Sequence, residues 1–505
     1  LTGTSNGTGA SPAVYFATTN WQTFVNSYTA GGAITIKGTN TSSANTGPAI
    51  RMFGVQAQTT GSGSVSVEAS TQNAGTNAIE IYSATFLSNG YQGGATSLGS
   101  TSGDVKLQAN QGGILFNDGV PNSVTPTTVR GRNISIDNTG GTIDATTGAI
   151  TRGTGQTAGG VSGIKISDSR AFTATGNINL YGAGTTGSGV EISGAAALSA
   201  TNITINGENT STGGAAINMG NAASSLTASA GVTLTSGGAG SGTSLVAAGN
   251  ISVGTQLKIT TPAAGSIAGV ISGTGSLLKM GAGQTKLTAF DGTTYGTNTF
   301  SGGTTISQGS LLFGNGGGNY NKTAGTGGIT LGDANTGSSN LGLWIEKGKD
   351  ASQDSGKLSR AITVTNNGTG TATIGGATGT GAGWTAINGS ITLNRDVYFN
   401  DSTGDRLSID GKITGTGNIT LTGYRLTMVA AVQNDFVGDF TVSAGSILQS
   451  DTNANRAFST SNNLIVNGDW RLYGANPAIN SLTGSGTVTT YSGAPLFSIG
   501  NNNGG

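Results

Sequence analysis

The sequence predicts an all-β protein, a right-handed parallel β-helix in which short strands coil around a stacked apolar core. Apolar and polar residues alternate in runs of about four, which places one side of each run in a core. These runs recur with a loose period of about 25–30 residues, which lies in the range of solenoid repeats. Glycine makes up 91 of the 505 residues and often separates the runs. It suits sharp corners because it reaches positive φ without steric cost.

The alternating runs extend over most of the chain. For example, the step from Val105 to Ile134 has the same length as the step from Ile203 to Val232. The runs are residues 34–37, 65–68, 105–108, 134–137, 164–167, 178–181, 203–206, 232–235, 329–331, 362–365, 391–394 and 419–422. Strands this short fit one coil of a β-helix better than a propeller blade or a helical repeat. Within one run we expect Ile203 and Ile205 to point inward and Thr204 outward.

The composition excludes several classes of function. The chain has 22 basic and 22 acidic side chains, so its zero net charge predicts no binding to nucleic acid or anionic membrane. Without histidine or cysteine, it cannot form nucleophile–histidine catalytic systems, thiolate sites or histidine-based metal sites. No apolar run approaches the roughly 18 residues of a transmembrane helix. We expect no cofactor.

The segment 271–312 carries the most specific pattern. Its apolar and glycine positions resemble the autotransporter-associated β-strand repeat, although the stretch Asp291–Asn298 is longer than the usual linker of that family. The matching residues are Gly273, Gly275, Leu277, Lys279, Gly281, Gly283, Leu287, Phe300, Gly302, Gly303, Thr304, Thr305, Ile306, Gly309 and Leu311. Weaker copies follow at 415–421 with 434–448, and at 482–488.

This resemblance implies an extracellular location on the bacterial outer surface, export through a separate outer-membrane translocator, and a β-helical passenger. The N-terminal half is similar to filamentous-haemagglutinin-type adhesins, another class of secreted β-helix. We therefore expect three regions: a cap or solenoid start at 1–32, haemagglutinin-like coils at 33–265, and autotransporter-repeat coils at 266–505.

The segment Asn20–Tyr28 predicts either a short helix or an irregular packed segment near the first coil. Trp21, Phe24, Val25 and Tyr28 follow helical spacing, and Asn20 suits a helix N-cap. Such a segment would cap the open edge of the solenoid or bind a partner; we favour the cap.

Two charged segments are candidate sites. Glu346–Arg360 holds cations and carboxylates of cancelling sign, which favours a solvated loop over a recognition loop. The second segment contains Asp396, Asp401, Asp405 and Asp410, with Asn394 and Asn400 nearby. Carboxylates suit Ca²⁺ or acid–base sugar chemistry, but their spacing matches no calcium loop, and turns use the same residues. No catalytic, cofactor-binding or metal-binding residue is predicted.

The function that we expect is non-catalytic: an extracellular rod that acts as an adhesin or as a structural filament or coat subunit. Its expected partners are copies of itself, or glycans and proteins of a host or cell surface. We expect the final segment, Leu496–Gly505, to continue into further chain or to join end to end with another copy. One alternative is a β-helix polysaccharide lyase or glycosidase. Another is a carbohydrate-binding rod that uses Trp344, Trp384, Trp470 and Tyr473.

Overall fold

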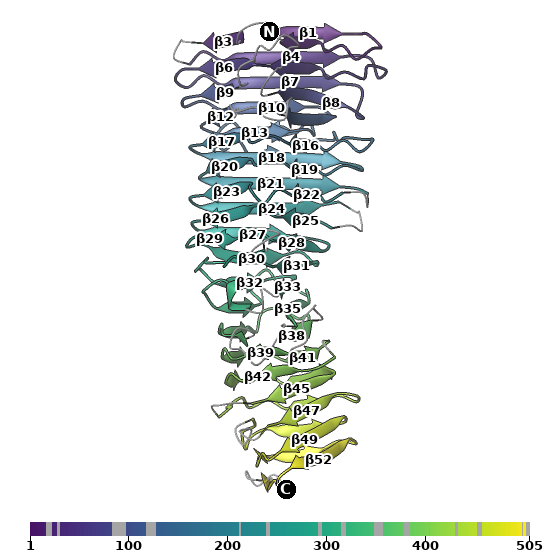
Figure 1. The fold of residues 1–505 in the computed structure, drawn as a ribbon, viewed down its shortest axis with the longest axis vertical. Helices are drawn as coiled ribbons and strands as arrows, with labels where there is room; N and C mark the ends of the chain where they lie inside the picture. Colours follow the sequence, from purple (N-terminus) through teal and green to yellow (C-terminus); the bar gives the residue numbers. More distant parts are fainter. Residues whose placement is uncertain are drawn as a thin grey trace. The chain divides into compact units, whose positions relative to one another are not determined.

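The computed structural model describes residues 1–16, 23–27, 31–82, 97–117, 128–211, 214–238, 243–290, 295–314, 320–347, 357–377, 384–402, 404–429, 433–451, 457–496 and 498–500. The chain divides into two compact units, Leu1–Ser272 and Gly273–Gly505. Both units consist of short strands that pair in parallel with the strands one coil earlier and one coil later (Figure 1). The predicted parallel β-helix is therefore confirmed.

The strands of the first unit form three ladders, here called sheets A, B and C. Sheet A contains β1 (Thr2–Ser5), β4 (Ile34–Asn40), β7 (Val65–Thr71), β10 (Val105–Ala109), β13 (Ile134–Asp137), β18 (Asn177–Gly184), β21 (Asn202–Asn209), β24 (Gly231–Gly237) and β27 (Gln256–Thr260). Sheet B contains β2 (Val14–Phe16), β5 (Ile50–Phe53), β8 (Asn77–Tyr82), β11 (Gly113–Asn117), β16 (Ile164–Ile166), β19 (Val190–Ile192), β22 (Ile217–Met219), β25 (Leu245–Ala247) and β28 (Gly265–Ile267). Sheet C contains β3 (Thr23–Ser27), β6 (Val55–Thr59), β9 (Ser97–Ser100), β12 (Thr128–Gly131), β17 (Ala171–Ala174), β20 (Ala197–Ala200), β23 (Ser225–Ala228), β26 (Asn250–Val253) and β29 (Ile271–Ser272). One coil contributes a strand to each sheet in turn.

The second unit also forms three ladders, here called sheets D, E and F. Sheet D contains β30 (Ser276–Met280), β32 (Thr304–Ile306), β34 (Ile329–Leu331), β37 (Ile362–Val364), β40 (Ile391–Leu393) and β43 (Ile413–Gly415). Sheet E contains β31 (Gln284–Leu287), β33 (Gly309–Phe313), β35 (Leu341–Glu346), β38 (Ala372–Ala377), β41 (Val397–Asp401), β44 (Ile419–Gly423), β46 (Phe440–Val442), β48 (Asn463–Val466) and β51 (Ser481–Thr483). Sheet F contains β36 (Lys357–Leu358), β39 (Thr385–Ile387), β42 (Leu407–Ile409), β45 (Arg425–Met428), β47 (Ile447–Ser450), β49 (Asp469–Tyr473) and β52 (Thr487–Ser492). A small ladder of β50 (Ala478–Ile479) and β53 (Ser498–Ile499) and a 3₁₀ turn at Tyr320–Lys322 are the remaining described elements of the second unit.

Register places like residues above one another in the core. Ile178 pairs with Ile203, and Ile203 with Val232, so branched side chains stack from coil to coil. Ile203 and Ile205 are fully buried, whereas Thr204 is half-buried on the outer side, which confirms the inward and outward assignment. The core excludes water because adjacent coils pack their apolar side chains directly on one another.

The repeat-like segment of the second unit also has the expected core. Five apolar residues singled out by the pattern are fully buried: Leu277, Leu287, Phe300, Ile306 and Leu311. Gly309 has φ 66°, and a Cβ there would lie 2.3 Å from the carbonyl oxygen of Gly281. Glycine is therefore required at this corner for both backbone conformation and space.

The short helix expected for Asn20–Tyr28 is wrong in the part that the structure describes. Residues 23–27 form β3, which pairs in parallel with β6 and forms the start of sheet C. A helix of this length gains few hydrogen bonds for its costly nucleus, whereas a strand beside β6 gains a full ladder. Asn20, Trp21 and Tyr28 lie outside the described residues, so their predicted roles are untested.

Candidate functional site

The carboxylates of the Asp396–Lys412 segment are engaged in contacts between coils. Asp396 accepts a hydrogen bond from the backbone N–H of Asn418 at 2.9 Å, and Asp410 pairs with Lys357 at 3.4 Å. Asp405 pairs with the guanidinium of Arg425 at 2.7 Å, while the buried Asp401 accepts from the backbone N–H of Arg425 at 3.4 Å. Among the described residues, no group of three carboxylates is placed to hold a metal ion.

The ends of the charged segment Glu346–Arg360 also pair with other coils. Glu346 binds Lys286 at 2.7 Å, and Lys357 binds Asp410 as described above. A guanidinium N–H of Arg360 donates to the carbonyl oxygen of Asn321 at 3.5 Å. Residues 348–356 lie outside the described part of the chain. The predicted loop is therefore untested, but its described ends serve as contacts between coils.

The aromatic candidates pack against neighbouring coils. Trp470 is fully buried, and its indole N–H donates to the Ser450 hydroxyl at 3.0 Å, so it belongs to the core. The guanidinium carbon of Arg406 lies 3.7 Å from the ring centre of Trp384, and Tyr473 stacks on Tyr491 with 5.0 Å between ring centres. Trp344 lies over Gly375, where a Cβ would approach its ring to 2.4 Å. Trp470 is therefore not available at the surface, whereas Trp344, Trp384 and Tyr473 are half-buried on the outer side of the coils.

The most elaborate polar arrangement is a hairpin that the sequence pattern did not predict. β14 (Thr142–Ile143) and β15 (Ile150–Thr151) pair antiparallel, unlike the parallel ladders around them. The hairpin is inserted between β13 and β16 and covers the outer side of sheet A. The alternation places Ile134 and Ile136 on the inner side of β13 and Ser135 and Asp137 on its outer side. Because the hairpin covers that outer side, Ser135 and Asp137 are also buried.

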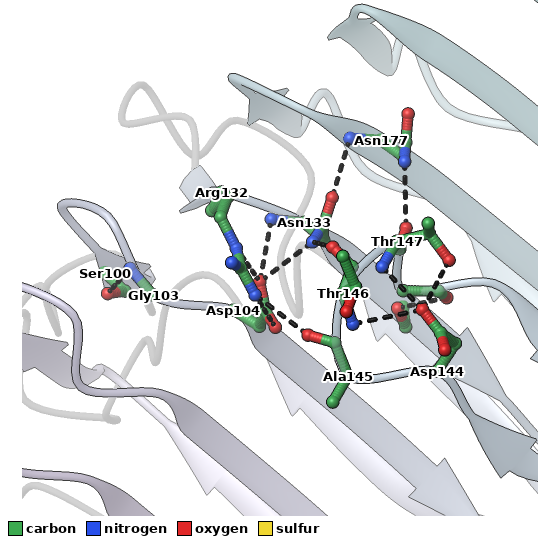
Figure 2. Close-up of polar contacts among 12 residues, drawn as sticks. Ser100, Gly103, Asp104, Arg132, Asn133, Asp144, Ala145, Thr146, Thr147 and Asn177 are labelled. Carbon is green, nitrogen blue, oxygen red and sulfur yellow. Dashed lines mark hydrogen bonds and ion pairs between the residues drawn. The ribbon is translucent and has the colours of Figure 1, made fainter.

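Side chains from two coils hold the hairpin tip through its backbone carbonyls. The tip consists of residues 144–148, and Figure 2 shows Asp144–Thr147 beside Arg132, Asn133 and Asn177. Arg132 donates to the carbonyl oxygen of Ala145 at 2.9 Å, Asn133 to that of Thr146 at 3.0 Å, and Asn177 to that of Thr147 at 2.9 Å. Three consecutive carbonyl groups are therefore satisfied by the sheet, which holds the tip in one position.

The tip also has its own internal order. The carboxylate of Asp144 accepts hydrogen bonds from the backbone N–H groups of Thr146 and Thr147, at 3.0 and 2.7 Å. Gly148 has φ 69°, and a Cβ there would lie 2.7 Å from the Ser135 hydroxyl oxygen. That hydroxyl donates to the carbonyl oxygen of Gly148 at 2.7 Å. The turn therefore requires glycine at position 148, where the backbone lies close to the sheet.

A buried carboxylate organises the side chains that hold the tip. Asp104 is 7% exposed and receives two hydrogen bonds from Arg132, both 2.9 Å long. It also accepts from the backbone N–H and the side-chain amide of Asn133, at 3.2 and 3.1 Å. This ion pair raises the pKa of the Arg132 guanidinium. The two-pronged contact fixes the plane of Arg132, so that its remaining N–H reaches Ala145.

The hairpin base borders a polar groove on the outer side of β4, β7 and β10. The groove encloses about 300 Å³, and its lining consists of Lys37, Gly38, Thr39, Glu68, Ala69, Ser70, Gln108, Asn110 and Gly140. Lys37 and Glu68 form an ion pair of 2.7 Å across the floor. The side-chain N–H₂ of Gln108 already donates to Asp137 and Gly141, and the Asn110 amide is bonded to the backbone of Thr71. The hydroxyls of Thr39 and Ser70 can both donate and accept, which suits a neutral polar chain.

One carboxylate in the groove and one at the hairpin tip have lowered pKa values. The hydrogen bond from Lys37 is the main cause that lowers the pKa of Glu68 in the groove, and the backbone N–H of Thr147 is the main cause that lowers the pKa of Asp144 at the hairpin tip, outside the groove lining. Both carboxylates are therefore ionised at neutral pH. A glycosidase requires a carboxylic acid that keeps its proton near the working pH, and neither group meets that need.

The spacing of the alternating runs in the sequence conceals the hairpin. The runs at Ile134 and Ile164 are one ordinary repeat apart, but Ile164 pairs with Ile114 in sheet B. The residue that pairs with Ile134 in sheet A is Ile178, which lies much further along the chain. This step is half as long again as the preceding step of sheet A, from Val105 to Ile134. The excess in this coil accommodates the hairpin.

Comparisons with known proteins add no relative: no family model, no curated protein and no solved structure matches this chain. No helix in the described residues is long and apolar enough to cross a membrane. The resemblance to autotransporter passengers therefore rests on the sequence pattern together with the β-helical fold.

Proposed function

We propose that this chain is a non-catalytic extracellular surface protein, an adhesin or a subunit of a filament or coat, whose coils present polar faces to a partner. The observation that carries this proposal is the pairing of outward charges between successive coils. Lys37 binds Glu68 at 2.7 Å, Arg51 binds Glu80 at 2.7 Å, and Lys165 binds Glu191 at 2.9 Å. The members of each pair occupy opposite positions in register.

This arrangement serves the stack rather than a reaction. A hydrolase or lyase needs acidic and basic groups that converge on one substrate bond. Here the paired carboxylates have cations from the neighbouring coil as partners, and low charge elsewhere leaves faces of hydroxyls and amides. Such faces can bind extended polymers or pack against a second copy through many weak contacts.

The structure gives specific support to one alternative, a carbohydrate-binding protein without catalysis. The groove beside the hairpin has mixed donors and acceptors, and an ion pair without excess charge. A neutral sugar chain fits that chemistry, because its hydroxyl groups both donate and accept. The enzyme alternative has less support, since Glu68 and Asp144 hold ionised carboxylates.

The decisive experiment compares catalysis with assembly. Purified protein is incubated with neutral and acidic polysaccharides, and new reducing or unsaturated ends are measured. We expect no such ends to form. If they do form, and if replacing Asp401, Asp405 and Asp410 by alanine abolishes their release, the protein is an enzyme.

In parallel, electron microscopy and light scattering follow self-association with and without residues 1–30. Labelling of intact bacterial cells with antibodies to the protein tests the surface location.

A further inference from the structure

The outer side of sheet C is almost free of charge. From β6 to β29, its outward positions in the described chain carry amides, hydroxyls and small side chains. These positions are Gln56, Gln58, Ser97, Gly99, Thr128, Arg130, Ala171, Thr173, Ala197, Ser199, Ser225, Thr227, Asn250, Ser252 and Ser272. Arg130 is the one charged residue among them. Its guanidinium is exposed and has no hydrogen-bond or ion-pair partner among the described residues.

Arg130 therefore differs from the outward cations of sheets A and B described above. Lys37, Arg51 and Lys165 each pair with a carboxylate one coil away. The register neighbours of Arg130 are Gly99 on one side and Thr173 on the other, and neither can neutralise it. An exposed guanidinium keeps all five N–H donors available for a ligand.

Gly99 creates a hollow directly beside Arg130. It lies in register between Gln58 and Arg130, so one outward side chain is missing from the row. The hollow measures about 240 Å³, and its lining consists of Gln58, Thr59, Ser97, Leu98, Gly99, Ser100, Thr101, Thr128 and Arg130. The row therefore contains a gap with a cation at one side and an amide at the other.

The fold does not require glycine at this position. A Cβ at Gly99 would meet only Gln58 Cγ at 3.8 Å and the carbonyl oxygen of Arg130 at 3.9 Å, which are ordinary contacts. The backbone of Gly99 is also outside the positive-φ set that needs glycine. This contrasts with Gly148, where a Cβ would collide with the Ser135 hydroxyl. Packing therefore does not require glycine at position 99, and the absence of a side chain leaves this space open.

The remaining groups around the hollow are hydrogen-bonding groups of neutral charge. The Thr128 hydroxyl donates to the Ser97 hydroxyl at 3.3 Å, which leaves the Ser97 hydrogen for another acceptor. Gln58 is exposed and offers both an amide N–H₂ and a carbonyl oxygen. Together with Arg130, these groups provide one strong site for an oxyanion and several sites for hydroxyl groups.

We propose that this hollow binds an acidic sugar residue, with its carboxylate on Arg130 and its ring hydroxyls on Gln58 and Ser97. A guanidinium matches a carboxylate with two parallel hydrogen bonds. Because the neighbouring outward positions are uncharged, the site binds one acidic group. Further acidic groups on a dense polyanion would add no affinity, since no second cation of the described chain lies beside Arg130. A sulfate ester has similar oxyanion chemistry, so the experiment distinguishes the two sources. The proposal does not depend on the proposed function and concerns a different sheet from the hairpin groove.

The test measures binding to the full chain by calorimetry and saturation-transfer NMR. The probes are a trimer of galacturonic acid, sulfated lactose, and neutral maltotriose as control. We expect weak binding of an acidic probe and at least tenfold weaker binding of maltotriose. The carboxylate and sulfate arms decide which oxyanion is preferred. Failure of both acidic probes to bind at millimolar concentration would overturn the proposal.

Three variants locate the site. Arg130→Gln should reduce affinity at least tenfold, whereas Lys258→Gln, which removes an equal charge from an outward position of sheet A, should change it less than twofold. Gly99→Val should reduce affinity similarly while retaining Arg130, because it fills the hollow. Thermal unfolding should show that both sheet C variants remain folded. Equal loss in Arg130→Gln and Lys258→Gln, or full binding by Gly99→Val, would contradict the proposed site.

Discussion

The side-chain amide of Asn133 donates a hydrogen bond of 3.0 Å to the carbonyl oxygen of Thr146, thirteen residues later. The same amide donates to Asp104 at 3.1 Å, and its oxygen accepts from the backbone N–H of Asn177 at 3.0 Å. Asn133 is 2% exposed, so water cannot replace these contacts. It joins three coils and the hairpin at one point.

We expect Asn133→Ala to reduce the free energy of unfolding by about 1–3 kcal/mol, because it leaves buried polar groups without partners. Urea unfolding measures this loss, and hydrogen exchange of the amides at 144–148 should accelerate more than exchange in β21. Thr142→Ala is the matched control, since Thr142 is exposed on the same hairpin. Equal effects of the two variants would show that Asn133 does not hold the hairpin.

The burial of the Lys279 ammonium predicts an unusual dependence of stability on pH. Its ammonium lies inside the second unit and donates to the carbonyl oxygens of Met280 and Gly281, at 2.8 and 2.7 Å. Burial nevertheless lowers its pKa from 10.5 to about 7. Between these values the unfolded chain binds more protons than the folded chain. The free energy of unfolding therefore rises with pH in that window and is lowest below pH 7.

We expect a rise on the order of 3 kcal/mol between pH 6.5 and 9.5, measured by urea unfolding. Lys279→Met should remove most of this rise and stabilise the protein at pH 6.5, because no charge is then buried. Lys258→Met, at an outward position, serves as control and should retain the rise. Measurements stop at pH 9.5 because Tyr82, whose pKa burial raises to about 12, affects stability above pH 10. A flat profile in the unmodified chain would contradict this prediction.

Adjacent positions of β21 test the packing of the core. Ile205→Asp would bury a carboxylate without a cation and should cost several kcal/mol. Thr204→Asp changes a half-buried outward residue and should cost about 1 kcal/mol or less. Thermal unfolding of the two variants gives the comparison. Similar losses at positions 204 and 205 would show that the inner and outer sides of this strand are energetically equivalent.

These examples show what the sequence could and could not predict. The alternation at Ile203, Thr204 and Ile205 reflects a property of each strand by itself, so it was readable from the chain. The sheet to which Ile164 belongs could not be predicted, because alternating runs look alike in sheets A and B. Only its pairing with Ile114 assigns Ile164 to sheet B. The hairpin was hidden for the same reason, since its extra residues resemble part of an ordinary coil.

The two polar sites depend on contacts between coils, which local patterns do not record. Asp104 and Arg132 are 28 residues apart, and their pairing follows from the register of β10 and β13. Gly99 and Arg130 belong to successive coils and meet only through the pairing of β9 and β12. The helical spacing around Phe24 was misleading because the ladder with β6 outweighed a weak local preference.

The final prediction concerns self-association through sheet F. β52 pairs with β49 on one side and is the last strand of that ladder in the described chain. All its six residues are exposed, and Val488, which pairs with the core residue Trp470, is 40% exposed. In the described chain, the core row that ends at Val488 is therefore open to solvent. Unpaired strand edges of this kind invite pairing with another chain.

We expect the 505-residue polypeptide to self-associate as its concentration rises, and Val488→Lys to weaken that association at least fivefold. A lysine here places a charge on the open apolar end, while the existing exposure of Val488 limits its effect on folding. Thr204→Lys adds the same charge at an outward position of the first unit and should leave association unchanged. Sedimentation velocity over a range of concentrations measures both variants. A monomeric unmodified chain at high concentration would refute self-association. Equal association of Val488→Lys and the unmodified chain would exclude this edge as the contact.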